Sequence, residues 1–132
     1  MKPVQIFSEF DFVLPDDQKL KKEEQTVFVL QSLTVEQEAF LDDTIEGEVP
    51  GQMKYGSTIL NVLHMGLKGV KNFPPGGKQI KFARDETAEK LPGDVHPWKS
   101  SCLQRIDVQS RRLISAKIRS LSQITEEESK NS

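Results

Sequence analysis

Three side chains are of the kinds that bind zinc or act as nucleophiles: His64, His96 and Cys102. Structural zinc sites use closely paired ligands, and these three residues do not have that spacing. A catalytic cysteine needs a neighbouring base, whereas Cys102 begins an expected helix, where a small thiol commonly packs as a buried apolar group. We therefore expect no metal, no cofactor and no enzymatic activity, and we expect Cys102 to be structural.

A glycine-rich stretch, GLKGVKNFPPGGKQIKF, occupies residues 66–82 and contains Gly76, Gly77 and Lys78. A phosphate-binding P-loop needs Ser or Thr after its Gly-Lys pair and a helix that begins there. Gln79 follows Lys78 instead, and residues 79–83 alternate as a short strand does. The stretch predicts a helix end, a loop in which glycine supplies a positive φ, and a strand.

Three arginines recur every seven residues, at Arg105, Arg112 and Arg119, within an expected helix over residues 102–122. Positions seven apart are two helical turns apart, so the guanidinium groups would be spaced by roughly 10 Å along one line. Such a line could bind an acidic helix or nucleic-acid phosphates, or could lie in solvent. The net charge of −2 and the lack of nearby aromatic side chains argue against nucleic acid.

The only tryptophan, Trp98, is the second candidate for partner binding. Tryptophan and arginine are over-represented at binding hot spots, so we predict that Trp98 and the three arginines contact a protein partner. The alternative for Trp98 is a packing role in the core or under a loop.

The C-terminal residues 125–132 begin with a capping box, Thr125 and Glu128, which is typical of a helix start. The chain ends four residues after Glu128, and so short a helix cannot offset its own nucleation. We expect residues 125–132 to form a flexible tail that is either frayed or ordered only on a partner or in a longer product.

The remaining patterns predict a single α+β domain over residues 1–124, mainly helical, with a small antiparallel N-terminal sheet packed on about three helices. Apolar residues alternate over 3–14, and β-type residues dominate 26–33. The expected strands are residues 3–14, 26–33 and 79–83, and the expected helices are residues 35–45, 57–70 and 102–122. Thr34 and Gln37 form a capping box for the first helix, and Gly66 allows a close approach on the second.

The composition is polar, with 36% hydrophobic and 29% charged residues and a mean hydropathy of −0.50. No apolar run is long enough for a membrane span, and a single cysteine gives no sign of an oxidising compartment. We therefore expect a cytoplasmic protein. Residues 1–66 have a net charge of −7 and residues 67–132 of +5, so neighbouring copies or partners could attract one another. Two solvated faces are the alternative reading.

Four stretches follow one another in a recognisable order: TVFVLQSLTVEQEAFLDD at 26–43, GLKGVKNF at 66–73, IKF at 80–82 and SLSQITEEESKNS at 120–132. Together they resemble the small tail-assembly-chaperone-like proteins of long-tailed bacteriophages. In many of these a helix closes with Gly-Leu-x-Gly-Trp-x-Asn-Phe before a glycine-containing turn and an Ile-x-Phe strand. Val70 stands where tryptophan is usual, and residues 91–108 form a longer segment than the family has.

The resemblance implies a non-enzymatic protein of the bacterial host cytoplasm. Such a protein binds the tape measure protein, and in some cases tail tube protomers, and keeps hydrophobic helices soluble while the tail polymerises. In some such phages a ribosomal frameshift extends the short product, which would complete the helix start at Thr125. The alternative is a structural virion subunit, such as a head-tail connector or decoration protein, that stays in the particle.

Overall fold

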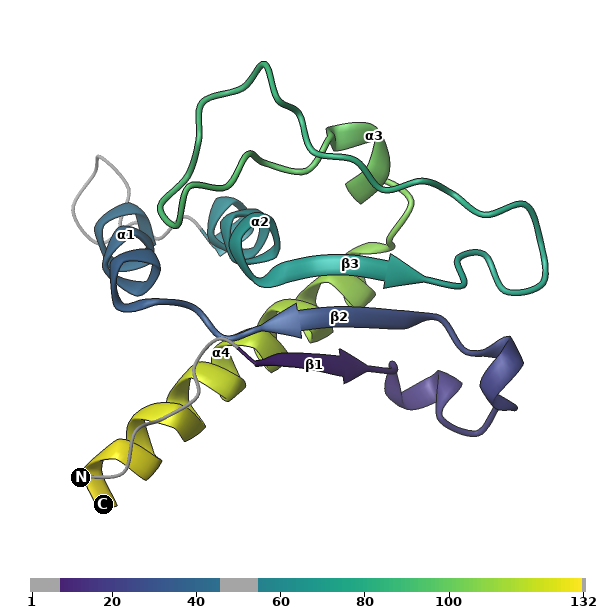
Figure 1. The fold of residues 1–132 in the computed structure, drawn as a ribbon, viewed down its shortest axis with the longest axis horizontal. Helices are drawn as coiled ribbons and strands as arrows, with labels where there is room; N and C mark the ends of the chain where they lie inside the picture. The colour runs from purple at the N-terminus through teal and green to yellow at the C-terminus, as the bar shows by residue number, and fades with distance from the viewer. Residues whose placement is uncertain (1–7, 46–54, 132) are drawn as a thin grey trace.

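A three-stranded antiparallel sheet and a set of helices share one hydrophobic core in the computed structural model (Figure 1). The structure describes the backbone of residues 8–45 and 55–131 and the side chains of residues 8–43 and 57–122. Its elements, in chain order, are β1 (Glu9–Phe12), η1 (Pro15–Asp17), η2 (Lys22–Glu24), β2 (Val27–Gln31), α1 (Val35–Ile45), α2 (Tyr55–Gly66), β3 (Leu67–Lys71), α3 (Ser100–Leu103) and α4 (Val108–Asn131). The predicted α+β class is confirmed.

The strands lie in the order β1-β2-β3. The middle strand, β2, is also the most apolar of the three. Phe10 pairs with Leu30 and Phe12 with Phe28, which puts these four side chains on one face, because alternate residues share a face. Helix α4 packs against this sheet, and its Ile118 belongs to the same core cluster as Phe28 and Leu30. The predicted strand over 3–14 is shorter at its C-terminal end, where Pro15 opens η1, and residues 3–7 lie outside the described residues.

Helix α1 has the bounds that its sequence predicts, and its capping box is confirmed. The backbone N–H of Gln37 donates to Thr34 Oγ1 at 3.1 Å, and the backbone N–H of Thr34 donates to Gln37 Oε1 at 3.0 Å. Two N–H groups that lack partners within the helix are thereby satisfied. The Gln37 amide also donates to the Pro92 carbonyl at 2.9 Å, so the cap joins α1 to the long loop after β3.

The third strand is β3, not the predicted residues 79–83. Helix α2 runs from Tyr55 to Gly66 and Leu67 begins β3 at once, so the predicted helix over 57–70 began two residues too late and ended four residues too late. A Cβ at Gly66 would lie 2.5 Å from Ile118 Cγ2, so this glycine does allow the expected close approach. Residues 79–83 form no strand, and the Gln79 side chain instead holds the preceding turn through the Phe73 N–H and the Pro74 and Gly77 carbonyls.

The long segment after β3 is irregular and lies across the top of the sheet and α2 in Figure 1. Gly76 has a φ of +70°, as expected for the turn, and the Asn72 side chain donates to the Glu23 and Gln25 carbonyls at 2.8 and 3.0 Å. Residues 76–78 therefore lie in a surface turn, and the residues directly after it, 79–83, are not helical. The predicted order of helix end, loop and strand is wrong, because the strand precedes the loop.

The predicted helix over 102–122 is divided. Short α3 ends at Leu103, and α4 begins at Val108 after a turn, with Asp107 as its N-terminal cap. The Asp107 carboxylate accepts the Ser110 backbone N–H at 3.0 Å and the Ser110 hydroxyl at 2.5 Å. These hydrogen bonds also lower the pKa of Asp107. The apolar spacing hides the break, because Leu103 at the end of α3, Ile106 in the turn and Ile114 on α4 are all buried.

Helix α4 continues to Asn131, so Thr125 and Glu128 lie inside it and do not start a new helix. A helix already formed from Val108 adds further turns without a second nucleation, which is why the capping box does not act as a start. Whether residues 125–132 form a flexible tail stays a prediction.

We predict that Asp107→Ala lowers the free energy of unfolding by about 1 kcal/mol, because the first turn of α4 loses its cap. Urea unfolding followed by circular dichroism measures this loss. Asp107→Asn is the matched control, since its side-chain oxygen still accepts the Ser110 N–H, and we expect it to stay close to the unsubstituted protein. Equal stability of all three proteins would contradict the assignment of Asp107 as the cap.

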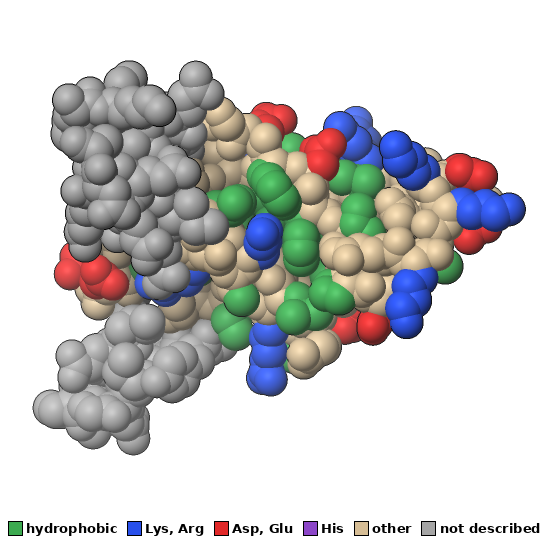
Figure 2. All heavy atoms as spheres, turned by 90° about the horizontal axis from the view of Figure 1, so that it is seen from below, with side chains coloured by type: hydrophobic (Ala, Val, Ile, Leu, Met, Phe, Trp, Pro, Cys, Tyr) green, Lys and Arg blue, Asp and Glu red, His purple; other side chains and the backbone are tan. Residues whose placement is uncertain are grey.

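The face that Figure 2 shows, seen from below Figure 1, has hydrophobic side chains gathered near its middle with lysines and arginines around them. Strand β1 is an edge strand whose outer side pairs with no strand among the described residues. Its Phe10 is 40% exposed, and Lys117 of α4 lies with Nζ 4.9 Å from the Phe10 ring centroid. Charged side chains of this kind commonly protect an edge strand from pairing with other chains.

Candidate protein-binding groove

A surface groove lies between α2 and the first turns of α4, with a volume of about 350 Å³. We call it the main groove, and it is lined by Ser57, Ile59, Leu60, Val108, Arg111 and Arg112. Leu60 is 36% exposed and Val108 54% exposed, so each helix presents an apolar side chain to solvent here. Neighbouring exposed apolar groups on two helices mark an interaction site more often than isolated ones do.

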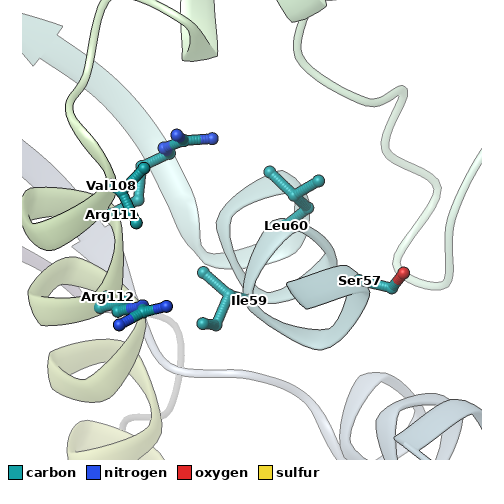
Figure 3. Close-up of a pocket in the computed structure, with 6 residues that line it drawn as sticks. All are labelled: Ser57, Ile59, Leu60, Val108, Arg111 and Arg112. Atoms are coloured by element: carbon teal, nitrogen blue, oxygen red, sulfur yellow. The ribbon is translucent and has the colours of Figure 1, made fainter. Parts of the chain in front are cut away.

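The chemistry of the main groove is apolar at its centre and cationic along α4. Figure 3 shows the Ile59 side chain of α2 pointing across the gap toward Arg112 of α4. Leu60 and Arg111 extend toward the same side of the gap. No aspartate or glutamate is among the described residues that line it. The groove therefore suits a ligand that is apolar on one side and negatively charged on another.

A second hollow of about 230 Å³ adjoins the main groove and shares Leu60 and Arg111 with it. We call it the side hollow, and its lining consists of Leu60, His64, Ser100, Leu103, Gln104 and Arg111. Three elements build it, because α2 supplies Leu60 and His64, α3 supplies Ser100 and Leu103, and α4 supplies Arg111. The turn between α3 and α4 also borders this space, since Gln104 lines it.

Arg111 separates the two hollows and is half-buried. Its Nε is buried, and among the described residues no group forms a hydrogen bond with it. A buried donor without an acceptor costs about 1–3 kcal/mol, more for a charged group. Arg111 was not among the candidate residues predicted from the sequence. No signal in the sequence singles it out, because its importance comes from the contact between α2 and α4.

His64 is held in one orientation by the loop. Its Nδ1 accepts the backbone N–H of Trp98 at 3.0 Å. Burial, and then the charge of Arg84, lower the pKa of His64 to about 4, so the ring is neutral near pH 7. With Nδ1 acting as an acceptor, the neutral ring carries its proton on Nε2.

The lowered pKa of His64 predicts that the free energy of unfolding decreases as the pH is lowered from about 6.5 to about 4. In this range the unfolded chain binds a proton at His64 and the folded chain does not, so stability rises with pH. The effect is on the order of 1–2 kcal/mol, reduced from the full shift because the ring is only partly shielded from solvent.

Urea titrations at several pH values measure this effect. His64→Asn is the control, since its Oδ1 can replace Nδ1 as the acceptor while the side chain no longer titrates. The free energy of unfolding of this variant should change less steeply with pH between about pH 4 and pH 6.5. An identical slope in both proteins would show that other groups cause it.

The predicted line of three arginines is not formed. Arg105 is exposed on the turn between α3 and α4, and only Arg112 and Arg119 lie on α4. Arg112 is exposed and lines the main groove, whereas Arg119 is half-buried and lines neither hollow. The even spacing required one unbroken helix over 102–122, and the turn before Val108 removes Arg105 from it.

Trp98 is not available as a partner anchor, because it is 6% exposed and belongs to the core. Its indole N–H donates to the Leu67 carbonyl at 2.9 Å, and its ring meets Phe82 edge-on at 6.2 Å. Arg84 stacks over the ring at 3.8 Å from its centroid. The packing alternative for Trp98 is therefore correct.

The other candidate residues have structural surroundings. Cys102 is buried, as expected, with Sγ 3.6 Å from the Lys81 carbonyl. His96 Nδ1 lies 3.1 Å from the Ala88 carbonyl. Within the part of the chain that the structure describes, no group of three or more His, Cys, Asp or Glu residues could hold a metal ion.

Comparison with known proteins gives no match to a family model, to a curated protein or to a solved structure. Across residues 8–45 and 55–131, no helix is long and apolar enough to cross a membrane. The observations that bear on function are therefore the main groove, its charges and the order of the sequence motifs.

Proposed function

We propose that this protein is a bacteriophage tail morphogenesis factor that works by reversible binding to another protein. Its partner is the tape measure protein, the tail tube protein or both, and it acts in the cytoplasm of the bacterial host. The motif order over residues 26–132 supports the assignment to tail assembly. The main groove supports the mode of action, and it is the observation on which the proposal depends.

The proposed mechanism is the covering of an apolar helix before it is built into the tail. A groove between two helices accepts an amphipathic helix with its apolar side chains at positions i, i+3 and i+4. Leu60 and Val108 would take the apolar side of such a helix, and Arg112 lies where an acidic flank would pass. The groove is small and open, which favours release when the partner reaches the growing tail.

Co-expression with the neighbouring tail genes tests the proposal. The tagged protein is expected to co-purify with the tape measure or tail tube protein, and Leu60→Asp should abolish this. The matched control is Lys81→Asp, because Lys81 does not line the main groove. Co-purification of neither tail component would contradict the proposal.

Mass spectrometry of purified virions separates the two modes of action. An assembly factor is absent from the mature particle, whereas a connector or decoration subunit is present in many copies. Stoichiometric recovery of the protein from virions would replace the proposal with the structural alternative.

A further inference from the structure

Resting on the proposed function, we infer that the side hollow binds a carboxylate of the partner helix, with Arg111 as its counter-charge. The occupant of the combined site is thus an acidic amphipathic helix. Its apolar side chain lies in the main groove beside Leu60, and its Asp or Glu reaches into the side hollow.

Arg111 lines both hollows, and no described acidic side chain lies within ion-pair distance of its guanidinium. A carboxylate supplies two oxygens that match the planar donors of an arginine. A bound carboxylate would therefore supply a counter-charge that no described side chain gives this guanidinium.

Three other residues that line the side hollow, Ser100, Gln104 and His64, have side chains that can donate hydrogen bonds. Because His64 Nδ1 accepts the Trp98 N–H, the free nitrogen of its neutral ring is an N–H donor. No aspartate or glutamate lines the hollow in the described part of the chain. The positive charge of Arg111, with no acid in the described lining, therefore favours an anion over a cation, and the neighbouring side chains can donate to it.

The main groove and the side hollow lie next to each other. They share Leu60 and Arg111, so groups bound in them can come from neighbouring positions of one helix. On a helix, side chains three or four residues apart are neighbours on one face. The partner segment is therefore expected to carry an apolar residue and an acidic residue at a spacing of three or four.

Two synthetic helices of about 18 residues test the inference, since this length suffices for a stable isolated helix. Both carry a leucine stripe, and they differ only in having Glu or Gln four residues after one central leucine. Calorimetric titration is expected to show about tenfold tighter binding of the Glu helix, because a charge-assisted hydrogen bond replaces a neutral one. The preference should shrink at high salt.

Variants assign the effect to one side chain. Arg111→Gln should bring the Glu helix to the affinity of the Gln helix, whereas Arg119→Gln should leave the preference intact. Should Arg111→Gln fail to fold, Arg111→Lys and the salt dependence of the unsubstituted protein carry the test, with a reduced preference expected for Lys. Equal binding of the two helices, binding of neither, or a preference that survives Arg111→Gln would overturn the inference.

The outcomes also separate the inference from the proposed function. Co-purification with a tail component together with equal binding of the two helices would overturn only the carboxylate site. A Glu preference that depends on Arg111, together with no tail component in the co-purification, would overturn only the tail-assembly role.

Discussion

Replacing Trp98 with alanine is expected to lower the free energy of unfolding by about 3–5 kcal/mol, the cost of removing a buried aromatic ring. The ring fills space between Phe82 and Arg84, and its N–H satisfies the Leu67 carbonyl at the start of β3. One side chain thus joins the long loop to the junction of α2 and β3. Urea unfolding followed by circular dichroism measures the loss.

Trp98→Phe is the control for this prediction. It keeps an aromatic ring but removes the indole N–H, so we expect a smaller loss of about 1–2 kcal/mol. If Trp98→Ala left stability unchanged and abolished only partner binding, Trp98 would be a binding anchor, contrary to its burial.

The second large effect is expected for Arg84→Met, which should lower the free energy of unfolding by about 2–4 kcal/mol because the carbonyls of His64 and His96 lose this charged donor. The guanidinium of Arg84 donates to the carbonyls of His64, His96 and Leu67, the last at 3.1 Å. His64 lies in the last turn of α2, where carbonyls are unsatisfied and a positive charge is favourable. Burial lowers the pKa of Arg84 to about 10, which still leaves it charged at neutral pH.

Arg84→Lys separates charge from geometry. Lysine keeps the positive charge but has no planar fork, so it cannot reach three carbonyls and stack on Trp98 at once. We expect it to recover less than half of the lost stability in thermal or urea unfolding. Full recovery by lysine would show that the charge alone matters.

Local signals in the sequence predicted the parts of the fold that depend on neighbouring residues. The capping box of Thr34 and Gln37 placed α1 correctly, and the β-type residues that dominate 26–33 identified β2. Errors arose where tertiary packing decides the structure. Leu67 and Val70 continue the helical spacing of α2 but pair with β2 instead, because β2 would otherwise keep an unpaired edge.

The candidate site could be predicted only in outline. An arginine-bearing face on the last helix was expected, and Arg112 does line the main groove. The position of Arg111 depends on the break before Val108, which the cap residue Asp107 signals but the apolar spacing conceals. The side hollow could not be foreseen, because Leu60, Ser100 and Arg111 come together only when α2, α3 and α4 pack.

Hydrogen exchange of the free protein, and of the protein with the proposed tape measure or tail tube partner added, tests the central claim, that a partner protein binds between α2 and α4. We predict slower exchange of backbone amides in residues 57–64 and 108–112 in the complex. Slower exchange at the β1 edge, residues 9–12, with no change in those two segments would contradict the claim.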